Sequence, residues 1–289
     1  MDLQGSVIRP PGEADSILLQ VTLGCTHNAC TFCGAYLGKP FRVKPWERIA
    51  ADLDWAARHC QRIRRVFLCD GDALCLSHGK LLRLLEMIRR KLPWVVRVAT
   101  YAAARNVARK SDAELRELRE AGLALCYLGL ESGDDDVLAA VHKGVDAATQ
   151  IAQARRLMAA GMKLNVTVLL GLAGVDGSLR HARRTGEALT ALQPDQVAAL
   201  SLMLIPGTPL HAAAQEGRFR LHDARGLLAE LRELLAHTHL ERGLFLANHA
   251  SNHLPMTLRL PRDKDAALAL LDQALAGKVA LKEERFRRL

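Results

Sequence analysis

The stretch AAGMKLNVTVLLG, residues 159–171, places a glycine directly after an alanine-rich helical segment and then enters an apolar run. Glycine just past a helix adopts left-handed geometry, and the apolar run that follows is typical of a buried strand. The same signature occurs at Glu120-Ala121-Gly122-Leu123, ahead of another apolar run. A helix-to-strand unit that is used more than once predicts a parallel sheet of the α/β class.

Six apolar runs are predicted as strands, with helical patterns between them. The strands are expected at Ser16–Gly24, Arg65–Asp70, Val95–Tyr101, Ala124–Glu131, Lys163–Gly171 and Gln196–Ile205. Leucine or alanine recurs every three or four residues in the predicted helices Pro45–His59, Lys80–Lys91, Asp112–Ala121, Ala147–Ala160 and Leu179–Leu192. Six units are fewer than the eight that close a full barrel, so we expect a partial (β/α)6 TIM-like barrel.

The pattern changes after Pro206-Gly207-Thr208-Pro209, and this change suggests the domain organisation. We expect an N-terminal arm at 1–13, the barrel at 14–210 and a mostly helical C-terminal extension at 211–289 that packs on the barrel. Within the extension we predict helices at Ala224–Leu240 and Lys264–Ala276, and a short edge strand at Met256–Leu260. An extension of about 80 residues with one strong helix has too thin a core to be an independent domain.

The composition excludes several classes of protein. The 289 residues are 49% hydrophobic and carry a formal charge of +9, as in many globular proteins. No apolar run approaches the roughly 18 to 20 residues that a membrane helix needs, and the N-terminus lacks the order of a secretory signal. Seven cysteines without such a signal indicate reduced thiols in the cytoplasm. The charge leaves two interpretations open: basic side chains spread over solvated helix faces, or an anionic or RNA partner.

Three cysteines are clustered directly after the first predicted strand. Cys25, Cys30 and Cys33 form a Cys-x4-Cys-x2-Cys set in VTLGCTHNACTFC, residues 21–33. Three thiolates on one loop can hold three irons of a four-iron cluster, which leaves the fourth iron open to an exogenous ligand. A zinc site made of the same cysteines and His27 is the alternative, although four ligands in so short a segment are cramped.

These residues resemble the radical S-adenosylmethionine (radical SAM) superfamily, and the resemblance covers most of residues 16–210. The commonest family signature has three residues between the first two cysteines, whereas this chain has four. The resemblance implies that the three clustered cysteines hold a [4Fe–4S] cluster and that Phe32 lies near the adenine of S-adenosylmethionine. The turn at 206–209 resembles one of the cobalamin-associated subgroup, but we expect a single-domain member without the cobalamin domain.

Further motifs match the family in order and imply which residues contact S-adenosylmethionine. FLCDGD, residues 67–72, stands where the family has a Gly-Gly-Glu-like segment that receives the methionyl amino group. Aspartates replace the first glycine and the glutamate, and the match implies that Gly71 and Asp72 bind the cofactor. Later motifs imply that Glu131 and Ser132 contact the ribose or carboxylate of the cofactor and that Gly171 packs on its adenine.

The resemblance also implies an activity. A member of this family cleaves S-adenosylmethionine reductively to a 5′-deoxyadenosyl radical, which here would act on a small-molecule substrate. The implied partner is an electron donor such as flavodoxin or ferredoxin, and the enzyme would be cytoplasmic and oxygen-sensitive. The same chemistry on RNA, suggested by the +9 charge, and a zinc-stabilised non-catalytic binding protein are the alternatives. No catalytic side chain is predicted.

Two groups of residues are candidates for contact with the substrate. Tyr101 and Arg105 follow the third predicted strand, and they are expected either at the barrel mouth or in surface packing. The segment Asn248–His253 is polar and lies between apolar runs. Either its Asn248 and His249 line the substrate pocket, or the segment is an ordinary loop.

Overall fold

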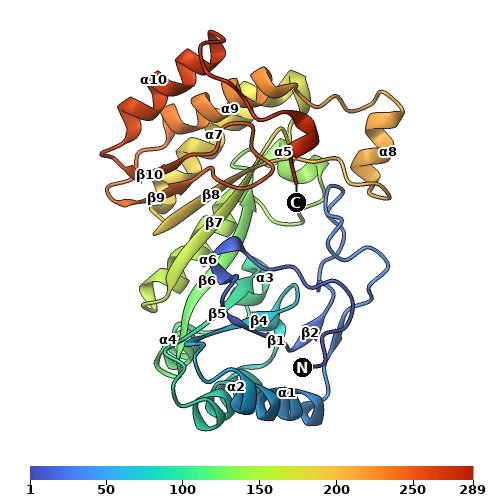
Figure 1. Ribbon diagram of the computed structural model, residues 1–289, viewed down its shortest axis with the longest axis vertical. Coiled ribbons are helices and arrows are strands. Elements are labelled where there is room, and N and C mark those ends of the chain that lie inside the picture. Colours follow the sequence, from blue (N-terminus) through green and yellow to red (C-terminus); the bar gives the residue numbers. More distant parts are fainter. Residues whose placement is uncertain (289) are drawn as a thin grey trace. The chain divides into compact units, whose positions relative to one another are not determined.

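Strands and helices alternate along residues 1–288, the part of the chain that the computed structural model describes (Figure 1). Eight strands belong to one sheet, in the order β1-β4-β5-β6-β7-β8-β9-β10. Their bounds are β1 Ile17–Gln20, β4 Arg65–Cys69, β5 Arg97–Ala102, β6 Leu123–Glu131, β7 Lys163–Leu170, β8 Gln196–Ser201, β9 Gly243–Leu246 and β10 Thr257–Leu260. The first six correspond to the six predicted strands, and the α/β partial-barrel class is confirmed.

The helices lie between and after these strands along the chain. They are α1 Trp46–His59, α2 His78–Lys91, α3 Ala104–Val107, α4 Asp112–Glu120, α5 Asp135–Ala140, α6 Ala147–Ala159, α7 Gly174–Leu192, α8 Pro209–Gln215, α9 Ala224–His237 and α10 Lys264–Leu275. The sequence missed α3, α5 and α8, since each is too short to show a helical period. Within residues 1–288, no helix combines the length and the apolar character needed to cross a membrane.

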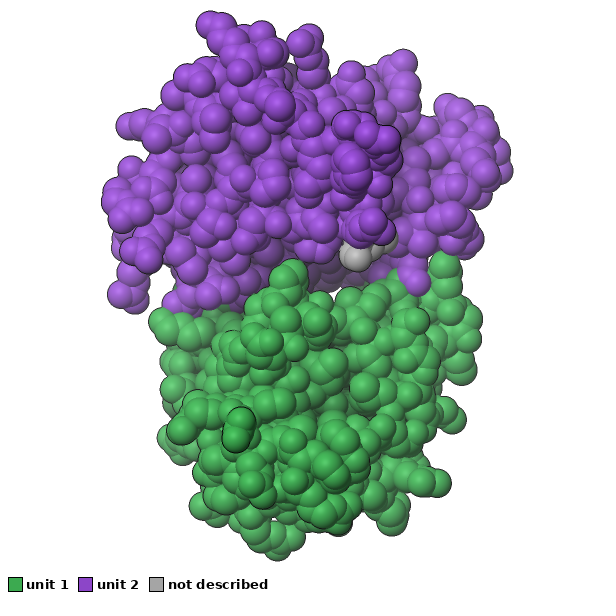
Figure 2. All heavy atoms as spheres, viewed as in Figure 1, with its two compact units in different colours: residues 1–28, 35–128, 153–164 green, residues 29–34, 129–152, 165–289 purple. Residues whose placement is uncertain are grey.

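The chain divides into two compact units (Figure 2). Unit 1 comprises residues 1–28, 35–128 and 153–164, and unit 2 comprises residues 29–34, 129–152 and 165–289. The predicted boundaries of arm, barrel and extension are a different division of the chain, and they stay a prediction.

The two glycines predicted to end helices ahead of a strand have positive φ as expected, +111° at Gly122 and +88° at Gly161.

In unit 1, the strands β1, β4, β5 and β6 pair in parallel. One face of these strands carries a core of Phe67, Cys69, Ala99, Leu125 and Tyr127. The Phe67 ring packs edge-on against Tyr101 and Tyr127, with centroid distances of 5.1 and 5.8 Å. Such edge-to-face pairs contribute about 0.5–1.5 kcal/mol beyond the area they bury, so the aromatic cluster stabilises this face of β4, β5 and β6.

The N-terminal arm is attached to unit 1 by a buried carboxylate. Glu13 is fully buried, and its Oε1 accepts hydrogen bonds from the Tyr127 hydroxyl at 2.7 Å and from Arg97 Nη2 at 2.5 Å. The Ser16 hydroxyl donates to the other carboxylate oxygen. A buried charge is costly unless it is paired, and these three donors hold the end of the arm against β5 and β6.

In unit 2, β9 extends the sheet beyond β8 in parallel, and β10 pairs antiparallel with β9. Both strands come from the C-terminal extension, so the sheet has two strands more than the six predicted for the barrel. The predicted edge strand at 256–260 is confirmed as β10, which ends the strand order. The sequence missed β9 because GLFL is only four residues long and does not alternate. The predicted helix at 224–240 ends earlier, at His237.

Helices α7 and α9 pack closely in unit 2 because a glycine lies between them. A Cβ on Gly186 would lie 2.7 Å from the Leu234 carbonyl oxygen and 2.8 Å from His237 Cβ. Gly79, in α2, has no neighbouring atom within 4 Å of the same position. Glycine in a helix usually costs stability, and of these two glycines Gly186 is the one that close packing requires.

We expect Gly186→Ala to lower the free energy of unfolding by about 1–3 kcal/mol, since the added methyl group forces α7 and α9 apart. The control Gly79→Ala is expected to raise it by about 0.4–1 kcal/mol, because alanine reduces the freedom of the unfolded chain. Urea denaturation followed by circular dichroism gives both values. Equal effects of the two substitutions would show that the helices do not depend on Gly186.

Candidate functional site

The residue before the first clustered cysteine is held from several sides in unit 1. Gly24 has φ of +71°, and a Cβ there would lie 2.7 Å from the Lys39 carbonyl oxygen. Its N–H donates to Oδ2 of Asp70 at 3.2 Å, and Lys39 Nζ forms an ion pair with the same oxygen. Asp70 is fully buried. The segment that leads into Cys25 is therefore fixed to the carboxyl end of β4.

Gly71 lies directly against this segment. Its N–H donates to the Gly24 carbonyl oxygen at 3.2 Å. A Cβ on Gly71 would come within 2.8 Å of that oxygen and 3.0 Å of the Tyr36 ring. No larger residue fits here, so a glycine is required where the sequence predicted a cofactor-binding glycine.

Asp72 presents a carboxylate oxygen without a partner. The side chain is fully buried, and its Oδ2 accepts hydrogen bonds from Thr26 Oγ1 at 3.2 Å and from Asn106 Nδ2. In the described residues no group donates to its buried Oδ1. Burial raises the pKa of Asp72 to about 6. A buried oxygen of this kind is expensive unless a donor satisfies it, and an ammonium group would do so.

The two candidate substrate residues of unit 1 lie in different surroundings. Tyr101 belongs to the aromatic cluster around Phe67, and burial raises the pKa of its hydroxyl. Arg105, on α3, donates from Nη1 to His27 Nδ1 at 2.8 Å. The cysteine segment thus contacts Arg105 through His27, whose Nδ1 lone pair is engaged by the guanidinium. Contact of either residue with a substrate stays a prediction.

The second and third clustered cysteines belong to unit 2. The Cys33 N–H donates to the Cys30 carbonyl oxygen at 3.2 Å, and the Thr31 N–H donates to the Val141 carbonyl oxygen at 3.0 Å. Phe32 packs against an apolar cluster made of Val137, Val141, Leu172, Leu202 and Leu210. Within residues 1–288, no three His, Cys, Asp or Glu side chains are gathered as a metal site. The three-cysteine ligand set stays a prediction.

Glu131 and Ser132, at the end of β6, have different partners in unit 2. Glu131 has φ of +64°, and its Oε1 accepts a hydrogen bond from Lys143 Nζ at 3.0 Å. Ser132 is fully buried, and its Oγ lies 2.8 Å from His181 Nδ1. His181 Nε2 lies 3.0 Å from the Leu169 carbonyl oxygen, so it carries the proton and the serine hydroxyl donates to Nδ1. The sequence analysis missed His181, although a histidine on the apolar face of α7 was a signal.

Gly171, directly after β7, is held by a buried carboxylate. Its N–H donates to Oε1 of Glu230 at 2.5 Å, and the Ser178 hydroxyl donates to the other oxygen. Burial raises the pKa of Glu230 to about 7. A Cβ on Gly171 would lie 2.6 Å from Leu221 and 2.9 Å from Leu227. The sequence missed Glu230, although a single acid on the leucine-rich face of α9 was a signal.

The polar segment at 248–253 follows β9 in unit 2. Asn248 is exposed, and His249 Nδ1 lies 2.8 Å from the Ser251 hydroxyl. That hydroxyl accepts the Ser201 N–H at 3.1 Å, and the Ser201 hydroxyl donates to Asn252 at 2.8 Å. The segment is therefore attached to the carboxyl end of β8, the edge where barrel enzymes carry their chemistry. Substrate contact by Asn248 and His249 stays a prediction.

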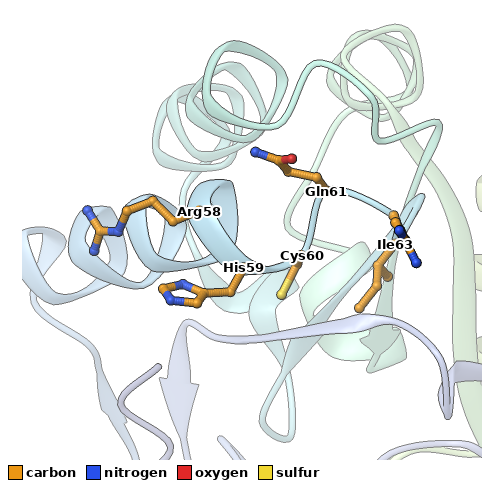
Figure 3. Close-up of a pocket in the computed structure, with 6 residues that line it drawn as sticks. Arg58, His59, Cys60, Gln61 and Ile63 are labelled. Carbon is orange, nitrogen blue, oxygen red and sulfur yellow. The ribbon is translucent and has the colours of Figure 1, made fainter.

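A hollow of about 220 Å³ lies elsewhere in unit 1. Figure 3 shows Arg58 and His59 on the last turn of α1, followed by Cys60 and Gln61 in the turn after it. This turn leads into the amino end of β4, whereas Asp70 and Asp72 follow its carboxyl end. The hollow is not part of the candidate site.

Known proteins resemble this chain over part of their length. The heme chaperone HemW of Bacillus subtilis is 27% identical over 162 residues, which are 55% of this chain and 42% of that protein. Coproporphyrinogen III oxidase (HemN) of Escherichia coli superposes with a TM-score of 0.56 at 17% identity, covering 76% of this chain and 51% of its own. Methylornithine synthase (PylB) superposes with a TM-score of 0.52 at 16% identity, covering 77% of this chain and 63% of its own. The chain spans less than two thirds of each of these proteins, and the structural likeness shows the fold alone.

The family model of the Radical SAM superfamily matches residues 19–182. The matched range begins in β1 and ends in α7, and it includes the clustered cysteines, Asp72 and Glu131. It covers more than half of the chain. This chain belongs to the radical SAM superfamily.

Proposed function

We propose that this protein holds a [4Fe–4S] cluster through Cys25, Cys30 and Cys33 and binds S-adenosylmethionine at the iron that lacks a cysteine. The chemistry that these groups supply when bound is one-electron cleavage of S-adenosylmethionine to a 5′-deoxyadenosyl radical, directed at a small-molecule substrate. The observation that carries the proposal is the unpartnered Oδ1 of Asp72. The other carboxylate oxygen of Asp72 accepts a hydrogen bond from Thr26, which directly follows Cys25. Family membership and the cysteine spacing support it.

Asp72 is assigned to the ammonium group of the cofactor. Thr26 and Asn106 hold Oδ2, so the side chain cannot rotate freely and Oδ1 keeps one direction. A cationic donor placed there would satisfy the buried oxygen and favour the ionised carboxylate. Gly71 supports the arrangement because its missing side chain lets the cysteine segment approach β4. The residues present therefore suit an amino acid ammonium group.

The remaining contacts are assigned from the family motifs. Phe32 and Gly171 are assigned to the adenine, and Glu131 and Ser132 to the ribose or carboxylate. An acidic one-electron donor such as flavodoxin or ferredoxin is the proposed partner, in the cytoplasm, where thiols stay reduced. A small molecule is preferred to RNA as substrate, because the sequence has no basic stripe interleaved with aromatic residues. Heme, for which the Bacillus relative is named, belongs among the molecules to be screened.

Anaerobic reconstitution with iron and sulfide tests the proposed function. We expect about four irons per chain, and release of 5′-deoxyadenosine on addition of S-adenosylmethionine and dithionite. Iron, sulfide and zinc counts and chromatography of the nucleoside provide the readouts. A colourless protein with one zinc, or an iron protein that releases no nucleoside with any candidate substrate, would contradict the proposal.

The substitution Cys30→Ser tests the ligand set. We expect the iron count to fall to background while the far-ultraviolet circular dichroism is unchanged, because the apolar core of unit 2 does not include this thiol. Cys60→Ser is the matched control, a half-buried thiol at the end of α1, and it should keep the full iron count. Equal iron in both variants would remove Cys30 from the site.

The substitution Asp72→Asn tests the ammonium contact. Hydrogen bonds to charged groups contribute about 1.5–3 kcal/mol, so we expect the affinity for S-adenosylmethionine to fall about 10- to 100-fold. The iron count should stay that of the unsubstituted protein. Equilibrium binding to the reconstituted protein gives the affinity, with the exposed Asp176→Asn as control. An unchanged affinity would show that Asp72 does not contact the cofactor.

A further inference from the structure

Large apolar side chains are exposed together near the N-terminus of unit 1. Half of the ten that are exposed in the described residues fall within the first 43 positions, each between 40% and 47% exposed. We call this group the apolar patch, and its members are Leu3, Ile8, Leu37, Phe41 and Val43. Single exposed apolar residues are ordinary, whereas a group of them marks a site of interaction.

The two segments that carry the apolar patch contact one another. Arg42 Nη2 donates to Gln4 Oε1 at 2.6 Å, and Lys39 Nζ donates to the Ser6 carbonyl oxygen at 3.3 Å. The Gln4 N–H donates to Gln20 Oε1 at 2.8 Å, which ties the arm to β1. Figure 1 shows the N-terminus beside β2, which spans Thr22–Leu23. The arm and the segment after the cysteines, which together carry all five residues of the apolar patch, therefore lie against each other.

The apolar patch reaches the residue that precedes Cys25. Strand β3, Arg42–Val43, pairs with β2 so that Leu23 faces Arg42 and Thr22 faces Val43. A Cβ on Gly24 would lie 3.3 Å from the Cα of Phe41. A partner seated on the patch would therefore lie beside the chain segment that carries the first proposed cluster ligand.

Exposed arginines accompany the apolar patch along the chain. Arg9 follows Ile8, Arg42 lies between Phe41 and Val43, and Arg48 follows at the start of α1; we call these three the basic rim. Of the nearby acidic residues, Asp2 is paired with Lys44 at 3.5 Å, and Glu47 is exposed. The whole chain carries +9. This balance favours an acidic partner, because complementary charge speeds encounter, whereas two copies of this chain would bring basic rims together.

We propose that the apolar patch is the docking surface for the acidic one-electron donor that reduces the cluster, an inference that rests on the proposed function. Flavodoxin is the donor class to which the proposal commits. In the step it serves, a flavin hydroquinone is oxidised by one electron and the cluster is reduced by one electron, with no bond formed between the proteins. Complexes that transfer electrons are small and weak, and a patch of five residues with a basic rim suits that class.

The variants Leu37→Asp and Ile8→Asp test the docking surface. Each places a carboxylate on the patch, so it removes apolar contact and repels an acidic donor. We expect the KM for reduced flavodoxin, measured from 5′-deoxyadenosine release, to rise at least about tenfold. The rate with dithionite should stay within a factor of about two. Val96→Asp is the control, 65% exposed and directly before β5, and its KM should not change.

Binding of oxidised flavodoxin, measured by calorimetry, gives a readout that does not depend on turnover. We expect weaker binding by both patch variants and unchanged binding by Val96→Asp. Unchanged KM and unchanged binding in the patch variants would overturn the proposal. A dimer of the unsubstituted protein that becomes monomeric in the variants would assign the patch to a second copy and overturn it too. Loss of nucleoside release with dithionite in the unsubstituted protein would instead count against the proposed function.

Discussion

The buried carboxylate of Asp70 is the interaction on which the cysteine segment of unit 1 depends. It accepts the N–H of Gly24, which precedes Cys25, and forms an ion pair with Lys39, which follows the clustered cysteines. One side chain therefore fixes both flanks of the segment to the end of β4. A buried ion pair is rarely a large source of stability, but loss of one partner leaves a buried charge unpaired. The pair acts as a constraint on geometry, and the glycines at 24 and 71 make its close approach possible.

Asp70 and Asp72 are two residues apart, yet their surroundings give them different roles. Asp70 faces a cation and a backbone donor, so its charge is already compensated within unit 1. Asp72 receives hydrogen bonds from two neutral side chains, and burial raises its pKa to about 6. Lys110 and Arg105 act on Asp72 only from a distance, so a cationic ligand in direct contact would stabilise this carboxylate further. The aspartate that stands at the first glycine of the family segment thus makes a structural contact, and Asp72 is the one proposed to bind the ligand.

The sheet could be predicted from the sequence because its signals are local. Apolar runs between helical patterns gave all six parallel strands of the barrel, two of them directly after a glycine-ended helix, while β9 was too short to show a pattern. The polar partners could not be predicted, since Glu230 and Gly171 are 59 residues apart and His181 and Ser132 are 49 apart. The family motif was enough to single out Asp72 as a candidate, but its hydrogen-bond partner Asn106 could not be predicted, because it is brought close by the pairing of β4 with β5. The cysteine ligand set stays a prediction, because Cys25 belongs to unit 1 and the other two to unit 2.

The C-terminal extension of unit 2 contributes to the shape of the candidate site as well as covering the sheet. Glu230, on α9, holds the N–H of Gly171, and leucines of the extension fill the space where a side chain at this glycine would lie. His181, on α7, accepts a hydrogen bond from the Ser132 hydroxyl, and its Nε2 lies 3.5 Å from Oε1 of Glu230. The carboxyl ends of β6 and β7 are thus joined through one buried polar network. Because Glu230 accepts the Gly171 N–H and lies beside His181, the conformation of the loops after β6 and β7 depends in part on α9, which is far from them in sequence.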